Sequence, residues 1–148
     1  MNIAEMTGLD LIQALVAGTI PPPSIMETMA MRFAEVRKGY VRFLARADGR
    51  HLNPMGGVHG GFAATVLDSV TGCAVHTMLE AGFAYGTVDL NIKMLRPVPR
   101  DVELAAESTV LHISRTLGVS DGTLKTSDGK LLAHATATCY VFRTDAAR

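Results

Sequence analysis

The sequence has no excess of charge of either sign, because 14 lysine and arginine residues balance 14 aspartate and glutamate residues among its 148 residues. A neutral chain gives no electrostatic reason to bind nucleic acid or an anionic membrane. The chain also lacks a basic and then apolar signal segment, and no run reaches the roughly 18 apolar residues of a membrane span. We therefore expect a cytoplasmic protein that has neither nucleic acid nor a membrane as partner.

Cysteine is scarce, and the two cysteines that occur, Cys73 and Cys139, lack CxxC spacing and a nearby histidine cluster. The histidines show no metal-ligand spacing with each other or with the cysteines, so we expect two reduced thiols, no metal site and no cofactor. The GxSxG motif of serine hydrolases is absent, as are the Walker and dinucleotide-binding glycine patterns.

The chain length suits one compact domain, and apolar residues make up 48% of it. A small, neutral and apolar protein tends to hide surface by self-association, which favours an oligomer. The N-terminal part contains an amphipathic helix over Thr7–Gly18 and an extended turn at Pro21–Pro23. Two short strands are expected at Met29–Val36 and Tyr40–Arg46.

The segment Val58–Leu79 is long enough for about six helical turns, and its apolar residues recur on every side, which is typical of a central buried helix. Everything after it has strand patterns, and Thr87–Leu95 alternates strictly, with Thr87 and Asp89 on the same face. The predicted strands are Thr87–Leu95, Val102–Ile113, Leu117–Thr126 and Leu131–Arg143.

Two strands, one buried helix and four strands favour an α+β fold in which a curved antiparallel sheet wraps a single helix. We divide the chain into an N-terminal helical extension (residues 1–28), one domain (29–143) and a tail (144–148).

A glycine-rich segment, Asn53–Gly61, leads into the predicted helix. Gly60 and Gly61 fall where a helix begins, and the unpaired N–H groups there carry partial positive charge. Such N–H groups can stabilise a developing oxyanion. The alternative is a flexible turn that only allows the helix to begin.

Asp68 is the one formally charged residue at neutral pH between Gly60 and Leu79. A carboxylate among apolar residues costs several kcal/mol if it has no partner, so such residues usually serve a function or a specific contact. Asp68 is therefore a candidate general base. The alternative is a structural aspartate that bridges to a neighbouring strand.

His59 and Asp68 are nine residues apart, which on one helix means about 13.5 Å of axial rise and opposite sides. Catalytic contacts are about 3 Å long, so one helix cannot bring both residues to the same reacting carbon. If both are catalytic, the site needs helices from two subunits, and a dimer is required.

The spacing Asn53-x5-His59-Gly60-Gly61-x6-Asp68 resembles the signature of hot-dog thioesterases related to the phenylacetate-degradation thioesterase and to human acyl-CoA thioesterases, within the 4-hydroxybenzoyl-CoA thioesterase superfamily. The segment Thr87–Asn91 followed by Arg96-Pro97 looks like that family's strand after the central helix. The similarity runs from about Tyr40 to Phe142 and implies a hot-dog fold.

The resemblance also implies a role for each matching residue. Asp68 matches the catalytic carboxylate, which activates water or attacks the thioester itself, and Gly60 matches the backbone donor that polarises the carbonyl. Asn53 and His59 match polar residues that line the thioester. Thr87 matches a hydroxyl that helps Asp68 to hold the attacking water.

The chain departs from some relatives, which carry a glutamate nucleophile followed one turn later by a hydroxyl residue; here the residue one turn after Asp68 is Gly72. This difference favours the pair of Asp68 and Thr87. Whether Asp68 acts as a base or as a nucleophile stays open.

The resemblance implies hydrolysis of an acyl- or aryl-CoA thioester by a homodimer, which we expect to assemble further into a homotetramer. Candidates to bind the CoA part are Gly61, Arg96 and Arg115, with Arg100 and Lys93 as further cations. Each of these cations could equally be an ordinary solvated charge. Two other functions are considered: an acyl-thioester dehydratase of the same fold, and a non-catalytic module that binds or senses acyl-CoA.

Overall fold

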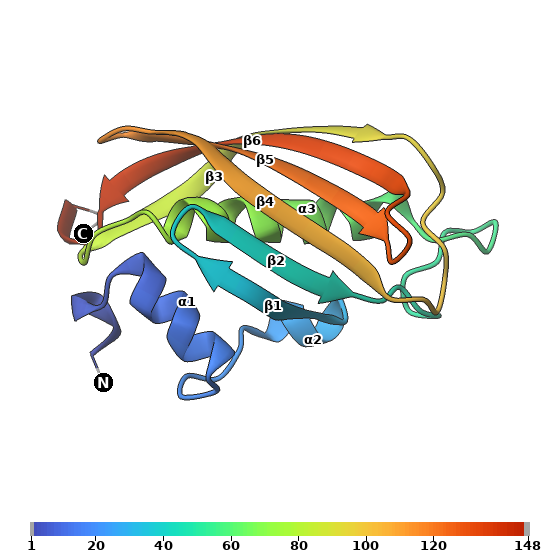
Figure 1. Ribbon diagram of the computed structural model, residues 1–148, viewed down its shortest axis with the longest axis horizontal. Helices are drawn as coiled ribbons and strands as arrows, with labels where there is room; N and C mark the ends of the chain where they lie inside the picture. Colours follow the sequence, from blue (N-terminus) through green and yellow to red (C-terminus); the bar gives the residue numbers. More distant parts are fainter. Residues whose placement is uncertain (1, 147–148) are drawn as a thin grey trace.

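A six-stranded antiparallel sheet wraps around one long helix, α3 (Gly60–His76), in the computed structural model, which describes residues 2–146 (Figure 1). The strand order is β1-β2-β4-β5-β6-β3, so β1 and β3 form the two edges. The strands are β1 (Met31–Arg37), β2 (Tyr40–Ala45), β3 (Phe83–Met94), β4 (Leu104–Ile113), β5 (Leu117–Thr126) and β6 (Leu131–Arg143). The predicted α+β arrangement, with a single central helix, is confirmed.

Helix α3 packs closely against the inner face of the sheet. Val66, Leu67 and Val70 on the helix are fully buried. A β-carbon at Gly122 of β5 would lie 2.8 Å from the Thr71 side chain, so the close approach of helix and sheet at this point requires glycine. This contact holds α3 at a fixed depth in the curve of the sheet.

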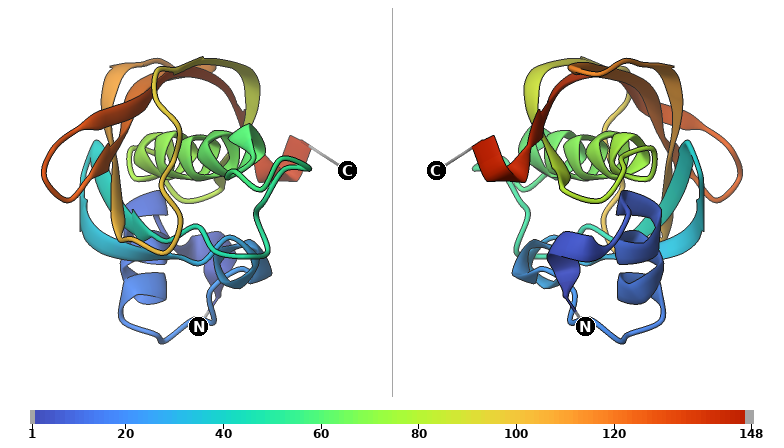
Figure 2. Two further views of the ribbon diagram at one scale, coloured as in Figure 1. Left: turned by 90° about the vertical axis from the view of Figure 1, so that its right-hand side faces the viewer. Right: turned by 90° about the vertical axis from the view of Figure 1, so that its left-hand side faces the viewer.

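One face of α3 is not covered by the sheet. Asp68, Ser69, Cys73 and His76 follow one another along this face and are only partly buried. An end-on view shows the sheet curving over one side of α3, with the N-terminal helices beneath its open side (Figure 2). The face of α3 that the sheet does not cover therefore borders the space between these helices and β3.

The N-terminal helices are part of this packing. Helix α1 (Gly8–Val16) contacts both β1 and α3, and Gly8 donates a backbone hydrogen bond to the carbonyl of Leu79. A second short helix, α2 (Ser24–Thr28), directly follows the turn predicted at Pro21–Pro23, and the sequence pattern did not predict a separate helix there. Helices α1 and α2 lie within the predicted extension. The predicted tail contains a 3-10 turn at Thr144–Ala146, and residues 147–148 lie outside the described residues.

Strand β3 contains a bulge, so its side chains do not alternate between the two faces as regularly as predicted. Its pairing with β6 shifts between Thr87 and Asp89, so Val88 is opposite no residue of β6, and its exposed fraction is 65%. Tyr85 and Thr87 precede the bulge and line a cavity beside α3. Leu90 follows it and packs against the core. The prediction that Thr87 shares a face with Asp89 is wrong, because one extra residue reverses the alternation.

Candidate active site

Asp68 brings a carboxylate to the exposed face of α3. Its Oδ1 atom is buried and has no hydrogen-bond partner among residues 2–146. Buried polar atoms are usually hydrogen-bonded, so an unpaired carboxylate oxygen indicates a group that meets a ligand or a reacting molecule. The structural alternative, in which Asp68 bridges to a neighbouring strand, is not observed in this part of the chain.

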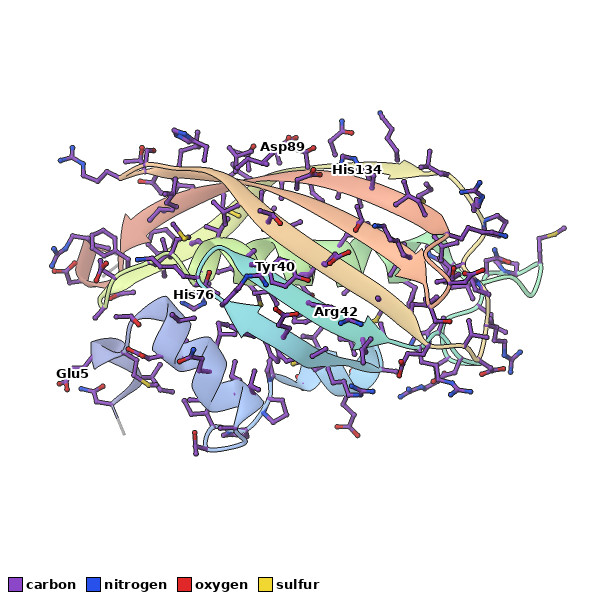
Figure 3. All side chains as sticks on the ribbon, in the orientation of Figure 1. Glu5, Tyr40, Arg42, His76, Asp89 and His134 are labelled. Atoms are coloured by element: carbon purple, nitrogen blue, oxygen red, sulfur yellow. The ribbon has the colours of Figure 1, made fainter. Side chains whose placement is uncertain are left out.

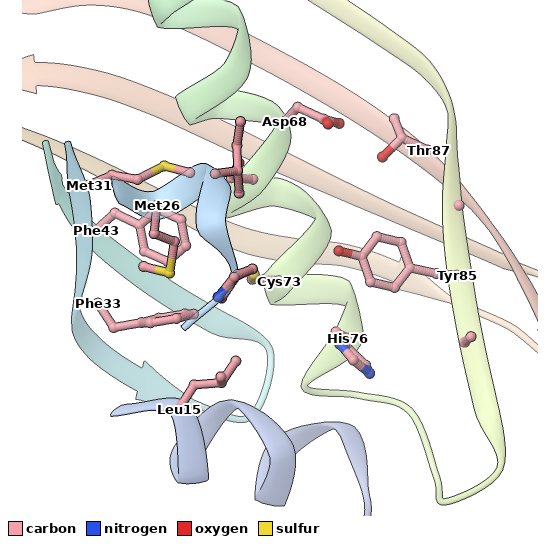
Figure 4. Close-up of a pocket in the computed structure, with 15 residues that line it drawn as sticks. Leu15, Met26, Met31, Phe33, Phe43, Asp68, Cys73, His76, Tyr85 and Thr87 are labelled. Carbon is pink, nitrogen blue, oxygen red and sulfur yellow. The ribbon is translucent and has the colours of Figure 1, made fainter. Parts of the chain in front are cut away.

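Asp68 and Thr87 line the same cavity from opposite walls, α3 and β3 (Figure 4). The cavity has a volume of about 510 Å³. The structure thus brings together two of the predicted residues. Within the described part of the chain, the Thr87 hydroxyl makes a single long contact of 3.9 Å with the sulfur of buried Cys139, which leaves it able to bind another group.

The other walls of this cavity are mainly apolar. They come from α1, α2, β1 and β2 and are formed by Leu15, Pro23, Ile25, Met26, Met31, Phe33 and Phe43. A largely apolar cavity with a few polar groups at one side is suited to a small organic ligand with one reactive polar end. The N-terminal segment therefore takes part in the site.

The start of α3 carries the second half of the predicted site. His59 is the N-cap, and its Nδ1 atom accepts a hydrogen bond of 2.7 Å from the backbone N–H of Gly61. The backbone N–H of Phe62 is bonded to the carbonyl of His59. The N–H of Gly60 makes no hydrogen bond within the described part of the chain. Among these three N–H groups, Gly60 alone is free to bind a ligand.

This capping changes the roles predicted for two residues. The N–H of Gly61 is already bonded, so the prediction that Gly61 binds substrate finds no support in the geometry. Because Nδ1 of His59 accepts this bond, the proton of the neutral ring is on Nε2, which is a donor on an exposed side chain. His59 is thus both a structural cap and a possible hydrogen-bond donor to a ligand.

Asn53 organises the loop before α3. Its side-chain oxygen accepts hydrogen bonds from the N–H groups of Met55 and Gly57, and its own N–H donates to the carbonyl of Gly57. The amide nitrogen of the side chain is left as a donor. This geometry is compatible with the predicted contact to a thioester oxygen, which stays a prediction.

The two halves of the site lie apart in one chain. Gly60 lines a second cavity of about 250 Å³ together with Met94 and Arg96, whereas Asp68 and Thr87 line the first. Eight residues on one helix correspond to an axial rise of about 12 Å. A single chain therefore does not bring the Gly60 N–H and the Asp68 carboxylate to one reacting carbon.

The predicted CoA ligands are also dispersed. Arg96 lies near the start of α3 and donates a hydrogen bond to the carbonyl of Leu131. Arg115 lines a cavity with Met78 and Leu79, beyond the other end of the helix. Arg100 is paired with Asp101 at 3.0 Å. One chain therefore does not gather these cations into a single phosphate site, and their contacts with CoA stay predictions.

Tyr85 and His76 also line the first cavity, although the sequence pattern did not identify either residue as part of the site. Burial raises the pKa of the Tyr85 hydroxyl well above its usual value and lowers the pKa of His76. The signal for Tyr85 was available, because residues two apart on a strand share a face and Tyr85 precedes Thr87 by two. It was overlooked because the predicted strand began at Thr87, whereas β3 begins at Phe83.

Cys73, on the same wall, is equally neutral, since burial raises the pKa of its thiol to about 12. Among the described residues, no group of three or more histidine, cysteine, aspartate or glutamate side chains is placed to hold a metal ion. No described helix is both long and apolar enough to cross a membrane.

Known proteins resemble this chain in sequence and in fold. The sequence-family model of the thioesterase superfamily matches residues 55–133 of this chain. Mouse acyl-coenzyme A thioesterase 13 is 33% identical over 98 residues, which cover 65% of this chain and 69% of the mouse protein. A curated relative from Halobacterium salinarum is 41% identical over 68 residues, so the chain spans only 44% of that protein's length.

Two solved structures extend the comparison. A phenylacetic acid degradation-related protein from Ralstonia eutropha has a TM-score of 0.79 and 32% identity, with coverage of 86% of this chain and 97% of that chain. A hypothetical thioesterase from Streptococcus pneumoniae, solved with coenzyme A, has a TM-score of 0.70 and 26% identity, covering 76% and 89% of the two chains. The predicted hot-dog fold and thioester hydrolase family are confirmed. The family model covers more than half of the residues and the fold agrees with that of the Ralstonia protein over 86% of the chain, so this chain belongs to the thioesterase superfamily.

Proposed function

We propose that this protein hydrolyses an acyl- or aryl-CoA thioester to the free acid and CoA. The observation that carries the proposal is the buried Oδ1 atom of Asp68, which has no hydrogen-bond partner among residues 2–146 and faces Thr87 across a largely apolar cavity. The acyl group would occupy this cavity, and the thioester carbonyl would lie at its polar side. The structure of the Streptococcus relative with coenzyme A supports CoA as the other half of the substrate.

Asp68 would take a proton from a water molecule, and the resulting hydroxide would add to the carbonyl carbon. The oxyanion that forms would accept a hydrogen bond from the N–H of Gly60, at the positive end of a helix dipole. The C–S bond would then break, and the CoA thiolate would leave and take up a proton. A thioester carbonyl is reactive enough to be hydrolysed with the help of the Asp68 carboxylate and the Gly60 N–H alone. The proposed reaction needs no metal or redox cofactor.

We further propose that Asp68 and Gly60 in one site come from two copies of the chain. The separation of the two cavities requires it if both residues act on one carbon. The edge strand β3 and the segment after it expose apolar side chains that a second copy would cover, namely Val88, Met94 and Leu95. A homodimer is then the smallest active unit, and a homotetramer would be two such dimers.

Release of free thiol from a panel of acyl-CoAs tests the activity. Asp68→Asn should lower turnover by about a hundredfold or more with little change in substrate binding. Asp121→Asn is the control, since Asp121 pairs with His134, which Figure 3 labels on the sheet, and neither residue lines the cavity beside Asp68. Unchanged turnover in Asp68→Asn would exclude this carboxylate.

Two other results would replace the proposed activity. Binding of acyl-CoA without any thiol release by the wild type would favour the sensing module. Addition or loss of water at the acyl chain, with the thioester intact, would favour a dehydratase.

A further inference from the structure

Beside the carboxylate of Asp68, the Tyr85 side chain fills the space that a side chain at position 72 would need. Gly72 follows Asp68 by four residues, so both lie on the same face of α3. A β-carbon at position 72 would lie 2.6 Å from the hydroxyl oxygen of Tyr85 and 2.8 Å from its Cε2 atom. The end of the tyrosine ring, which comes from β3, therefore occupies the place of a side chain one turn after Asp68.

The Tyr85 hydroxyl is available for a ligand. It makes no hydrogen bond to any residue in the part of the chain that the structure describes, and the ring points from β3 across the cavity toward α3 (Figure 4). Tyr85 is only partly buried, and a phenolic hydroxyl that no protein group occupies can both donate and accept a hydrogen bond to a small molecule in the cavity. Burial raises the pKa of this hydroxyl, with a smaller contribution from nearby acidic groups that include Asp68, so the group stays neutral.

The distances allow Asp68 and Tyr85 to share one small molecule. The β-carbons of residues four apart on a helix are about 5–6 Å apart. The Tyr85 oxygen lies close to where the second of these β-carbons would be. A carboxylate oxygen and the tyrosine oxygen can then each accept a hydrogen bond of about 2.8 Å from the same water.

We propose that Tyr85 is a third residue of the water site, in addition to Asp68 and Thr87; this inference rests on the proposed thioesterase function. The water would direct one hydrogen to Asp68, which accepts it as the bond to the carbonyl carbon forms. The other hydrogen would be held by the Tyr85 oxygen, which remains protonated throughout. One lone pair of the water then points to the thioester carbon, so Tyr85 acts on the rate of attack rather than on substrate binding.

Tyr85→Phe tests this role, because it removes a single oxygen atom and keeps the ring that packs beside His76. We expect kcat to fall by about tenfold or more while KM changes by less than about twofold. An unchanged kcat, or a loss seen only in KM, would overturn the proposal. Thermal unfolding of the same variant shows whether the fold is retained.

The shared volume offers a rescue experiment with a matched control. Tyr85→Ala should lower kcat and open space at position 72, and Gly72→Ser in that background would place a hydroxyl one turn after Asp68. We expect this pair to regain part of the lost kcat, whereas Tyr85→Ala with Gly72→Ala restores packing without an oxygen and should not. Equal recovery by serine and alanine would show a packing role and overturn the proposal.

The activity of the wild-type protein distinguishes a failure of the proposed thioesterase function from a failure of the role proposed for Tyr85. If wild type releases no thiol from any acyl-CoA, the proposed function fails whatever Tyr85 does. If wild type is active and Tyr85→Phe is equally active, the role of Tyr85 alone is rejected. If the alanine pairs do not fold, the result for Tyr85→Phe decides.

Discussion

The Nδ1 atom of His59 accepts a hydrogen bond from the backbone N–H of Gly61 at 2.7 Å. This single contact caps α3 and at the same time removes Gly61 from the set of possible oxyanion donors. The preceding N–H, that of Gly60, has no partner among residues 2–146. In the proposed mechanism, the N–H that polarises the carbonyl is therefore selected by a side-chain cap, and the role of Gly60 can be tested without disturbing the helix.

Gly60→Pro should remove the oxyanion donor and keep the fold. Proline is well tolerated at the first position of a helix, and the preceding residue, His59, already has φ −64° and ψ 136°, which proline permits. We expect kcat to fall by about a hundredfold or more, as for loss of one oxyanion donor elsewhere. Steady-state kinetics and circular dichroism of the variant are the measurements.

Gly60→Ala is the matched control for this variant. It keeps the N–H and adds the same β-carbon, which would lie 2.9 Å from the sulfur of the exposed, flexible Met94 side chain. It should retain most of the activity. Similar losses in both variants would mean that crowding, and not the missing N–H, explains the effect.

Mixed oligomers test whether the site lies between two copies. Gly60→Pro and Asp68→Asn subunits should each be inactive alone, and coexpression should restore about a quarter of wild-type activity. Random pairing gives one half mixed dimers, and each of these has one intact site of two. Coexpressed subunits that stay inactive would show that each chain carries its own complete site.

The fold could be predicted from sequence because its elements are long and periodic. The all-apolar segment around Val66 and the regular alternation in β6 leave little choice of secondary structure. Helix α2 was missed because five residues after Pro23 give no measurable periodicity. The bulge at Val88 was missed because register depends on the partner strand, and one extra residue decides which face Thr87 occupies.

The candidate site was only partly predictable for the same reason. Asp68 and Gly60 stand out in the sequence by charge and by position at a helix start. Tyr85 belongs to the site because Gly72 lacks a side chain, a complementarity between two elements that no single segment encodes. Likewise, Arg96 and Arg115 lie beyond opposite ends of α3, and this separation depends on how the strands are arranged around the helix.

His76 should make folding stability depend on pH. Burial lowers the pKa of His76 in the folded protein, whereas the unfolded chain has the usual value of about 6.5. Below about pH 6.5 the unfolded chain binds a proton that the folded chain does not, so the free energy of unfolding falls as pH falls toward the folded pKa. Urea unfolding at pH 7 and pH 5 measures this difference.

His76→Phe should reduce this dependence by up to one proton, because phenylalanine keeps a ring beside Tyr85 but cannot titrate. The reduction should appear below pH 6.5 and be absent above it. An unchanged slope in the variant would show that other groups control acid stability.

The N-terminal segment should set the length of the acyl group that the site accepts. Ile25 of α2 lines the cavity beside Asp68 and is 42% exposed, so a larger side chain can be placed there without disrupting the core. Ile25→Trp should fill part of the cavity and lower kcat/KM for long acyl-CoAs by about tenfold relative to acetyl-CoA, since each displaced methylene is worth about 1–3 kcal/mol.

Ile3→Trp, at an exposed position that does not line this cavity, is the control for that substitution and should leave the preference unchanged. The measurement is kcat/KM across a series of acyl chain lengths for both variants. If Ile25→Trp lowers activity equally on every substrate, the acyl group does not reach α2. The acyl site would then have to lie in the part of the cavity between α3 and β3, next to Ala84 and Gly86.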